Sequence, residues 1–320
     1  MQRRQIADTD IYVSPVALGC WPLTGMTSLH VTVEQSKQAI AGCLDLGINF
    51  FDTAYMYGAN GESELYLGEL LKARRSEAVI ATKGGLHWGG GVRVHDATPK
   101  TIRSECEESL RRLQSDYIDI YFLHAPDPSV PIEETAAVYR ELRASGKIRA
   151  VGVSNLSLEQ TKAFNEVCPI QVIQPPYNML YRGIEEDLLP WCLANDVSIT
   201  CYWPLMKGLL AGKLTLESTF PEGDSRQKYP FFHGEEFAKS LAMVDKFKQI
   251  AQDVGRTVAQ VVINWTIQQP GITSVLCGAK RLDQVEDNAG GMGWELTSEQ
   301  LAKIDLAIKQ RGTPVIKSAI

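Results

Sequence analysis

The sequence has no closely spaced cysteine pair, no long hydrophobic run and no clustered excess of positive charge. Its seven cysteines are scattered without a C-x-x-C pair, which argues against a disulfide framework or a zinc site. It contains no apolar run of about 18 residues and no N-terminal signal pattern. The formal net charge of −6 argues against nucleic-acid binding. We therefore expect a cytoplasmic protein with reduced thiols, no metal and no membrane or nucleic-acid partner.

What the sequence does contain is a regular alternation of two kinds of segment. Short apolar runs rich in β-branched residues are each followed by a longer stretch of helical periodicity. The strand-like runs are VSPVALGC, INFFDTA, AVIATK, DYIDIYFLH, IRAVGVSN, IQVIQPPYN, VSITCYWPL and ITSVLCGAK. The helical stretches include residues 33–46, 62–71, 99–113, 132–145, 157–167 and 185–195. This alternation predicts parallel strands joined by crossover helices.

Two architectures fit such a pattern, a doubly wound sheet and an eight-stranded barrel. The count of eight strands, their even spacing and the uniform composition favour one (β/α)8 TIM barrel domain over residues 1–320. Before the first strand, RRQIADTDIYVS predicts a β-hairpin that closes the bottom of the barrel. Residues 237–254 predict an extra helix, and the Gly- and Pro-rich residues 206–236 predict a long functional loop.

Reactive residues stand at the ends of three consecutive predicted strands. Asp52 ends the second strand, Lys83 the third and His124 the fourth, and Tyr57 follows Asp52 by five residues. The C-terminal ends of barrel strands meet at one face, where active sites lie. We therefore expect these four side chains to converge, which explains why the stretch FFDTAYMYG combines an acid with tyrosines and a glycine.

Such a cluster suits proton transfer to an oxygen on which negative charge develops. A tyrosine phenol has a pKa of about 10 in water. A neighbouring lysine is expected to favour the phenolate and lower this pKa, and an aspartate to keep the lysine charged. A neutral histidine can donate a hydrogen bond to a substrate oxygen. The group can then act as a general acid.

Each of the four residues also has a simpler explanation when it is taken alone. Asp52 can cap the following helix, Lys83 can be a solvated loop charge, His124 can be structural and Tyr57 can be a packing aromatic. Their joint occurrence at consecutive strand ends favours the functional interpretation. A barrel hydrolase that uses Asp52 and His124 as acid and base is an alternative, but it leaves Lys83 and Tyr57 without a role.

These motifs together resemble the aldo-keto reductase family, in particular its bacterial and potassium-channel-β-subunit-like branches. FFDTAYMYGANGESELYLGE is similar to the most distinctive signature of the family, and the resemblance continues through DYIDIYFLHAPD, GKIRAVGVSN, QPPYN, YWPLMKGLLAGK and GAKRLDQVEDN. It covers nearly the whole chain. It implies a catalytic tetrad of Asp52, Tyr57, Lys83 and His124, and a nicotinamide cofactor bound without a Rossmann domain. The absence of a G-x-G-x-x-G motif after a strand agrees with this.

The resemblance also implies the residues that contact the cofactor. Ser154, Asn155 and Gln174 match residues that hold the nicotinamide carboxamide, and Tyr202 matches the aromatic that stacks on the ring. Gly19 and Trp21 are expected to face the nicotinamide. The remaining contacts are expected from Pro204, Leu205, Lys207 and Gly208 at the pyrophosphate, and from Gly278, Lys280, Arg281, Gln284, Asp287 and Asn288 at the adenosine. Two cations near a helix start favour NADP(H). NAD(H) is the alternative, because Gln284 stands where many relatives have an arginine.

The function that the resemblance implies is NADPH-dependent reduction of aldehydes and ketones, with alcohol oxidation as the reverse reaction. Tyr57 would protonate the carbonyl oxygen, and Trp21, Trp88 and His124 would line the substrate pocket beside it. Trp203 is a further candidate for an apolar wall. The partner is then a small carbonyl or alcohol substrate. A second hypothesis is a nucleotide-binding sensor with slow turnover, like the channel β-subunits that this branch resembles.

Overall fold

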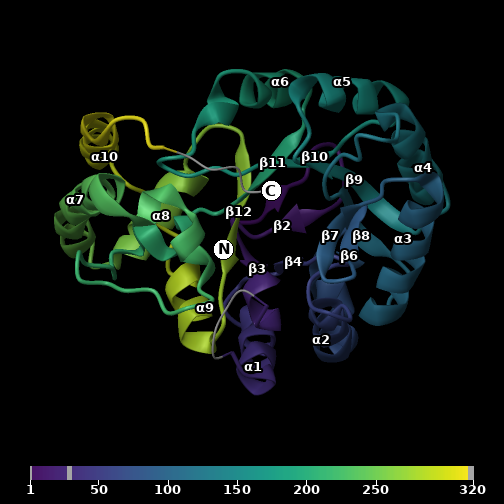
Figure 1. Cartoon of the computed structure of the whole chain (residues 1–320), viewed down its shortest axis with the longest axis horizontal. Helices are drawn as coiled ribbons and strands as arrows, with labels where there is room; N and C mark the ends of the chain where they lie inside the picture. Colours follow the sequence, from purple (N-terminus) through teal and green to yellow (C-terminus); the bar gives the residue numbers. More distant parts are fainter. Residues whose placement is uncertain (1, 27–30, 316–320) are drawn as a thin grey trace.

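The computed structural model describes residues 2–26 and 31–315, and its centre is a closed barrel of eight parallel strands (Figure 1). The last strand of the barrel pairs with the first, so no barrel edge is left open. This confirms the (β/α)8 barrel predicted from the alternation. The barrel strands are β3 (Val16–Gly19), β4 (Phe50–Asp52), β5 (Val79–Gly84), β8 (Ile118–Leu123), β9 (Ile148–Ser154), β10 (Val172–Gln174), β11 (Ser198–Tyr202) and β12 (Ile272–Gly278).

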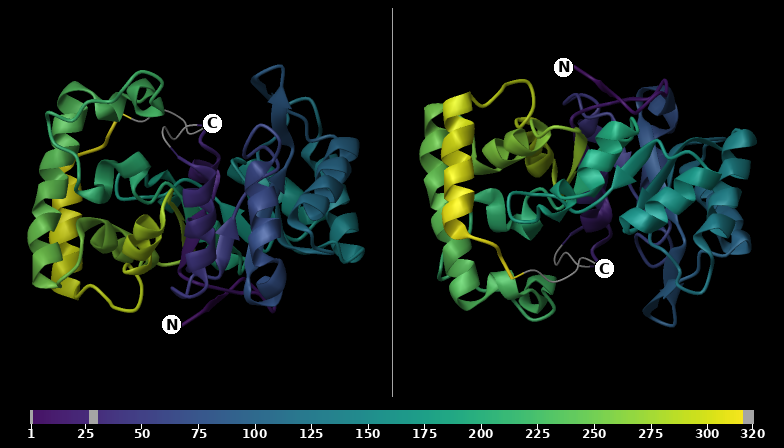
Figure 2. Two further views of the ribbon diagram at one scale, coloured as in Figure 1. Left: turned by 90° about the horizontal axis from the view of Figure 1, so that it is seen from below. Right: turned by 90° about the horizontal axis from the view of Figure 1, so that it is seen from above.

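Helices surround the barrel, one after each strand in the chain order. The helices of this ring are α1 (Val33–Cys43), α2 (Glu62–Leu71), α3 (Pro99–Leu113), α4 (Ile132–Ala144), α5 (Leu158–Val167), α6 (Leu188–Ala194), α8 (Val258–Ile267) and α9 (Leu282–Ala289). Two further helices, α7 (Gly234–Asp253) and α10 (Ser298–Arg311), pack against each other on one side of the molecule (Figure 2). Capping boxes begin four of the helices, at Thr32, Ser157, Thr257 and Thr297.

Some helix boundaries differ from the predicted ones for local reasons. The first predicted helix extended to residue 46, but α1 ends at Cys43, and Gly47 has a φ of 82° that turns the chain toward β4. The helix predicted over residues 185–195 is interrupted, with η3 (Gly183–Glu185) before it. The Asp187 side chain accepts a hydrogen bond from the Leu188 amide and starts α6 there. The extra helix α7 begins at Gly234, three residues earlier than predicted.

The predicted N-terminal hairpin covers one end of the barrel. Strands β1 (Arg4–Gln5) and β2 (Tyr12–Val13) are antiparallel. Ile6, Ile11 and Val13 are fully or almost fully buried, and they pack in one cluster with Phe50 and Phe122 of the barrel interior. The hairpin therefore acts as a plug, as predicted. No helix in the described part of the chain is long and apolar enough to cross a membrane.

The opposite end of the barrel carries the irregular segments. A second hairpin, β6 (Leu86–Gly89) and β7 (Val92–His95), projects at this end of the molecule, as Figure 2 shows. The short helices η4 (Met206–Ala211), η5 (Ser225–Lys228) and η6 (Pro230–Phe232) follow β11. Gly90 and Gly91 have φ values of 59° and 84°, so a two-residue turn of the type that suits tight hairpins joins β6 to β7.

Candidate active site

The alternation of side chains along three neighbouring strands brings polar residues to the upper end of the barrel interior. Phe50, Ala81 and Phe122 belong to the cluster inside the barrel. Residues two positions further along a strand point to the same face. Because β4, β5 and β8 are adjacent in the barrel, the next inward residues form one cluster, and these are Asp52, Lys83 and His124.

Lys83 and Asp52 form a buried ion pair at the floor of this cluster. The Lys83 Nζ atom lies 2.8 and 2.9 Å from the two carboxylate oxygens of Asp52, and it donates to the Thr53 carbonyl at 2.7 Å. The exposed fractions of the two residues are 1% and 3%. Gln174 Nε2 donates a further hydrogen bond of 2.8 Å to Asp52. Such a network compensates charges that would otherwise be very unfavourable inside a protein.

Tyr57 approaches this pair from the loop between β4 and α2. Its hydroxyl lies 3.4 Å from Lys83 Nζ. Its ring packs edge-on against Trp21 and His124, with centroid distances of 4.9 and 5.9 Å. Gly58 permits the turn, since its φ is 100° and an added Cβ would lie 2.9 Å from the Glu62 amide nitrogen. The acid, the tyrosine and the glycine of FFDTAYMYG thus contribute to one site.

His124 completes the cluster as a neutral side chain. Burial, and next the charge of Lys83, hold the pKa of His124 well below its ordinary value. Its Nδ1 atom is buried and has no hydrogen-bond partner among the residues that the structure describes. A buried polar nitrogen of this kind is normally satisfied. A bound molecule can supply the missing partner.

The predicted effect of Lys83 on the pKa of Tyr57 was wrong. Burial of the phenol, followed by the nearby Asp52 carboxylate, raises the pKa of Tyr57 well above its ordinary value. Lys83 does not reverse this, because its charge is already engaged by both oxygens of Asp52. Tyr57 is therefore a protonated phenol at neutral pH.

Polar residues from β9, β10 and β11 extend the site along the barrel mouth. Ser154 Oγ donates to the Gln174 carbonyl at 2.7 Å. Asn155 Nδ2 donates to the His124 carbonyl at 2.8 Å, and Asn155 Oδ1 accepts from the Tyr202 hydroxyl at 2.9 Å. The amide and hydroxyl groups predicted to hold a carboxamide are therefore fixed by one hydrogen-bond network.

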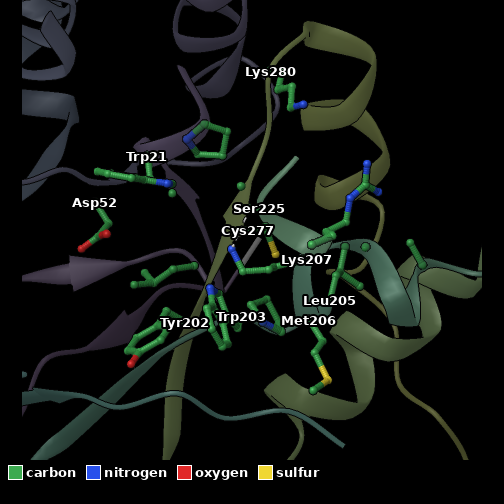
Figure 3. Close-up of a pocket in the computed structure, with 18 of the residues that line it drawn as sticks. Trp21, Asp52, Tyr202, Trp203, Leu205, Met206, Lys207, Ser225, Cys277 and Lys280 are labelled. Carbon is green, nitrogen blue, oxygen red and sulfur yellow. Dashed lines mark hydrogen bonds between the residues drawn. The ribbon is translucent and has the colours of Figure 1, made fainter. Parts of the chain in front are cut away.

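A cavity of about 860 Å³ opens above these residues (Figure 3). In the figure, Trp21 and Asp52 lie on one side of the cavity and Lys280 on another, and the Lys207 side chain extends between them. The cavity is large enough for a dinucleotide together with a small molecule. The predicted binding residues that line it are Gly19, Trp21, Ser154, Asn155, Gln174, Tyr202, Pro204, Leu205, Lys207, Gly208, Gly278, Lys280, Gln284, Asp287 and Asn288, and the predicted wall residue Trp203 lines it too.

Three of the predicted residues lie outside the cavity wall. Arg281 does not line it and forms an exposed ion pair of 2.9 Å with Asp283, so its contact with the adenosine stays a prediction. Trp88 packs, like Trp21 and Tyr57, against the small cluster of Ala54, Met56 and Leu86, and it donates to the Met56 carbonyl at 2.9 Å. Lys83 belongs to the floor but is buried below its surface, with its Nζ atom 3.4 Å from the Tyr57 hydroxyl.

The structure also brings to the cavity residues that were not predicted. Arg93 comes from β7, and Asp224, Ser225 and Arg226 come from the segment between β11 and α7. Arg226 is held by Asp224 at 2.6 Å. The only sequence signal was the length and irregularity of the two loops, because the placement of single residues depends on how each loop folds.

The backbone of the cavity wall is unusual. Asn155, Trp203, Met206 and Lys207 all have a positive φ, between 45° and 63°. Left-handed conformations are unfavourable for residues other than glycine, and they cluster at functional sites where the surrounding structure imposes them.

Lys207 is the most perturbed cation of this wall. Its ammonium lies 5.0 and 4.9 Å from the ring centres of Trp203 and Tyr229, and 3.5 Å from Ser225 Oγ. Burial lowers the pKa of Lys207 to about 8, while Asp224 acts in the opposite direction.

Within the described residues, no group of three or more His, Cys, Asp or Glu side chains could hold a metal ion.

Known proteins are similar to this chain in both sequence and fold. The sequence model of the Aldo/keto reductase family matches residues 15–309. The chain belongs to the aldo/keto reductase family. It is 40% identical to the aldo-keto reductase YhdN of Bacillus subtilis over 97% of this chain and 94% of that protein. It is 33% identical to a probable voltage-gated potassium channel subunit beta of Arabidopsis thaliana, over 90% of each chain.

A solved structure extends the similarity to three dimensions. The glycerol dehydrogenase AKR11B4 from Gluconobacter oxydans matches with a TM-score of 0.91 and 37% identity, over 99% of this chain and 98% of that chain. This aldo/keto reductase is therefore an oxidoreductase of a family that uses nicotinamide cofactors. The cavity suits such a cofactor, since it offers a fixed amide cluster, an aromatic residue and several cations.

Proposed function

We propose that the protein is an NADPH-dependent reductase of aldehydes and ketones. The observation that carries this proposal is the Tyr57 hydroxyl, which lies 3.4 Å from the buried Lys83–Asp52 pair at the floor of a cavity of about 860 Å³. Lys83 and Tyr57 would have no role in a hydrolase that used Asp52 and His124 as acid and base, whereas carbonyl reduction uses all four residues.

The proposed roles follow from the chemistry of each side chain. A bound nicotinamide cofactor supplies the hydride that reduces the carbonyl carbon. Tyr57 donates its phenolic proton to the carbonyl oxygen, and its raised pKa keeps that proton in place at neutral pH. Lys83 stabilises the phenolate that the donation leaves behind. His124, held neutral, donates a hydrogen bond that orients the carbonyl oxygen.

The charge distribution of the wall supports NADPH over NADH. Lys207, Arg226 and Lys280 all line the cavity, and cations of this kind complement phosphate groups. Gln284 does not replace a phosphate-binding arginine, because its Oε1 atom accepts a hydrogen bond of 2.8 Å from the Lys280 amide. On this proposal Lys280 and Arg226 take over recognition of the extra phosphate.

The substrate class and the location complete the proposal. The substrate is a small carbonyl compound, and the reverse oxidation of an alcohol uses the same residues, as the similarity to a glycerol dehydrogenase suggests. All seven cysteines are free and buried, which supports a reducing cytoplasm. A sensor function is the second candidate, favoured by the similarity to a channel β-subunit.

The test is a fluorescence titration with NADPH and with NADH, followed by turnover of an aromatic aldehyde. We expect tighter binding of NADPH and measurable reduction. Tight binding with negligible turnover on a panel of carbonyl compounds would favour the sensor. Equal affinity for the two cofactors would contradict the assignment of Lys280 and Arg226, and no binding would refute the proposal.

A further inference from the structure

The β6–β7 hairpin places one arginine above the candidate catalytic residues. Trp88 and Arg93 are directly opposite each other in the antiparallel pairing, so their side chains lie on the same face of the hairpin. The hairpin is fixed at its base, because Trp88 donates to the Met56 carbonyl and the His87 ring lies 2.8 Å from Glu105. The position of Arg93 is thus a consequence of a short, anchored element.

Arg93 faces the cavity between two tryptophans. Its guanidinium carbon lies 5.9 Å from the ring centre of Trp21 and 5.9 Å from that of Trp88. Trp21 in turn contacts Tyr57. The Arg93 side chain forms no hydrogen bond or ion pair with any residue in the described ranges, and it remains exposed. Two aromatic faces hold the side chain while all its N–H donors stay available.

Positive side chains outnumber negative ones around the cavity, although the chain as a whole carries a negative net charge. The three acidic residues that line the cavity each have a basic partner, Asp52 with Lys83, Asp224 with Arg226 and Asp287 with Lys213. The wall residues Arg93, Lys207, Lys228 and Lys280 have no acidic partner within 4.0 Å in the described part of the chain. Lys207 and Lys280 are assigned above to the cofactor.

Arg93 lies beside the candidate catalytic residues, although its charge also reaches Lys207. The positive charge of Arg93 acts on both Tyr57 and His124. It contributes to the lowered pKa of His124, after burial and the charge of Lys83. It also opposes the rise in the pKa of Tyr57 that burial causes. A cation that acts on both residues lies near the position of the reacting carbonyl. The cofactor phosphates, in contrast, are assigned to the wall built by residues 207, 226 and 280.

We propose that Arg93 recognises an anionic group on the substrate, so that the preferred substrates are short aldehydes or ketones that carry a carboxylate or a phosphate ester. The proposal rests on the proposed carbonyl reduction and adds a substrate class to it. A guanidinium binds the oxygens of either anion through two parallel hydrogen bonds. The aromatic faces of Trp21 and Trp88 limit the mobility of the arginine and leave an apolar surface for the short carbon chain.

The experiment compares matched neutral and anionic probes with the wild-type enzyme and NADPH. The pairs are butanal with 4-oxobutanoate, and glyceraldehyde with glyceraldehyde 3-phosphate. We expect a higher kcat/KM for the anionic member. Arg93→Gln should raise KM for the anionic probes about 10- to 100-fold, as expected for the loss of a hydrogen bond between charged groups. KM for the neutral probes should change by less than about twofold.

Controls separate a specific role from a structural one. Lys100→Gln removes an exposed charge on α3, outside the cavity, and should leave all four probes unaffected. Arg93→Lys should recover part of the preference, because a point charge remains without the two parallel donors. An effect on only one pair identifies whether carboxylate or phosphate is bound. An equal loss on neutral and anionic probes, or no wild-type preference, overturns the proposal.

Failure of the proposed function is distinguishable from failure of this inference. If no probe turns over, the enzyme–NADP⁺ complex is titrated with succinate and with inorganic phosphate, and tryptophan fluorescence is followed. Trp21 and Trp88 flank Arg93, so saturable quenching that disappears in Arg93→Gln would still support the anion site. Quenching that is identical in the two proteins, or absent in both, would refute it.

Discussion

The floor and the wall of the cavity are built on different principles. The floor consists of Asp52, Lys83, Tyr57 and His124, most of them buried at the ends of barrel strands or beside them. The wall comes mainly from the irregular residues 203–229 and from residues 278–288, which include most of α9. In the floor, Asp52, Lys83 and Tyr57 are joined by hydrogen bonds and His124 packs against Tyr57, whereas wall residues have strained backbones and partly exposed cations.

This difference matches the two tasks of the enzyme as proposed. Proton transfer requires distances that do not vary, and closed-barrel strands give the most rigid framework in the fold. Recognition of a cofactor and a substrate requires side chains that can close over a ligand. We therefore expect substitutions in the floor to change turnover, and substitutions in the wall to change affinity.

The largest expected effect is that of Tyr57→Phe. Removal of the proton donor should lower kcat for carbonyl reduction about 10²- to 10⁴-fold, the range typical of general acid catalysis. The affinity for NADPH should change little, because the ring still packs against Trp21 and His124. Steady-state kinetics and a fluorescence titration measure the two quantities. Wild-type turnover in this variant would assign the proton donor elsewhere.

The next effect concerns the stability of the floor. Lys83→Met leaves the Asp52 carboxylate buried with Gln174 as its remaining side-chain partner. Breaking a buried ion pair in this way costs about 3–5 kcal/mol of unfolding free energy. The double variant Asp52→Asn/Lys83→Met should recover much of this loss without recovering turnover. Urea unfolding tests the prediction, and a double variant no more stable than Lys83→Met would contradict it.

The difference between floor and wall also explains which site residues could be predicted from the sequence. Strand ends follow from hydrophobic alternation, so Asp52, Lys83 and His124 could be placed together from the sequence alone. Arg93 and Arg226 could not, because their positions depend on the turn at Gly90 and Gly91 and on the path of residues 206–233. The resemblance supplied the wall residues that lie at element ends, such as Asn155 and Lys280, while the contact expected of Arg281 stays a prediction.

A smaller effect is expected from the titration of Lys207. Its pKa is lowered to about 8, so the side chain is cationic below that pH and neutral above it. Asp224, Arg93, Arg226 and Tyr229 are the charged or titratable groups that surround it. A cation favours the cofactor phosphates, so the Kd for NADPH should rise as the pH increases from about 7 to about 9, by about three- to tenfold.

The matched control for this titration is Lys207→Arg. An arginine stays charged throughout this pH range, so the rise in Kd should disappear. If the rise persists in Lys207→Arg, the titrating group is another one, and Lys280 is the candidate because burial also lowers its pKa. Tyr57→Phe should keep the pH dependence of binding, since the floor takes no part in it.

The smallest expected effects come from two capping boxes of the same design. Ser157 and Thr257 begin α5 and α8, and each is paired with a glutamine three residues later. Substitution of either by alanine should cost about 1 kcal/mol of unfolding free energy. Thr257 also donates a hydrogen bond of 2.7 Å to Asp287 in the cavity wall, whereas Ser157 has no such contact with the floor.

Equal losses of stability should therefore be accompanied by unequal losses of affinity. Thr257→Ala frees Asp287 and should weaken NADPH binding a few-fold. Ser157→Ala should leave binding and turnover unchanged, although it lies two residues from Asn155, because Asn155 is held by the His124 carbonyl and by Tyr202. If both variants weaken NADPH binding equally, the affinity depends on the stability of the surrounding helices and not on the contact with Asp287. The floor would then not be the independent unit that its hydrogen bonds indicate.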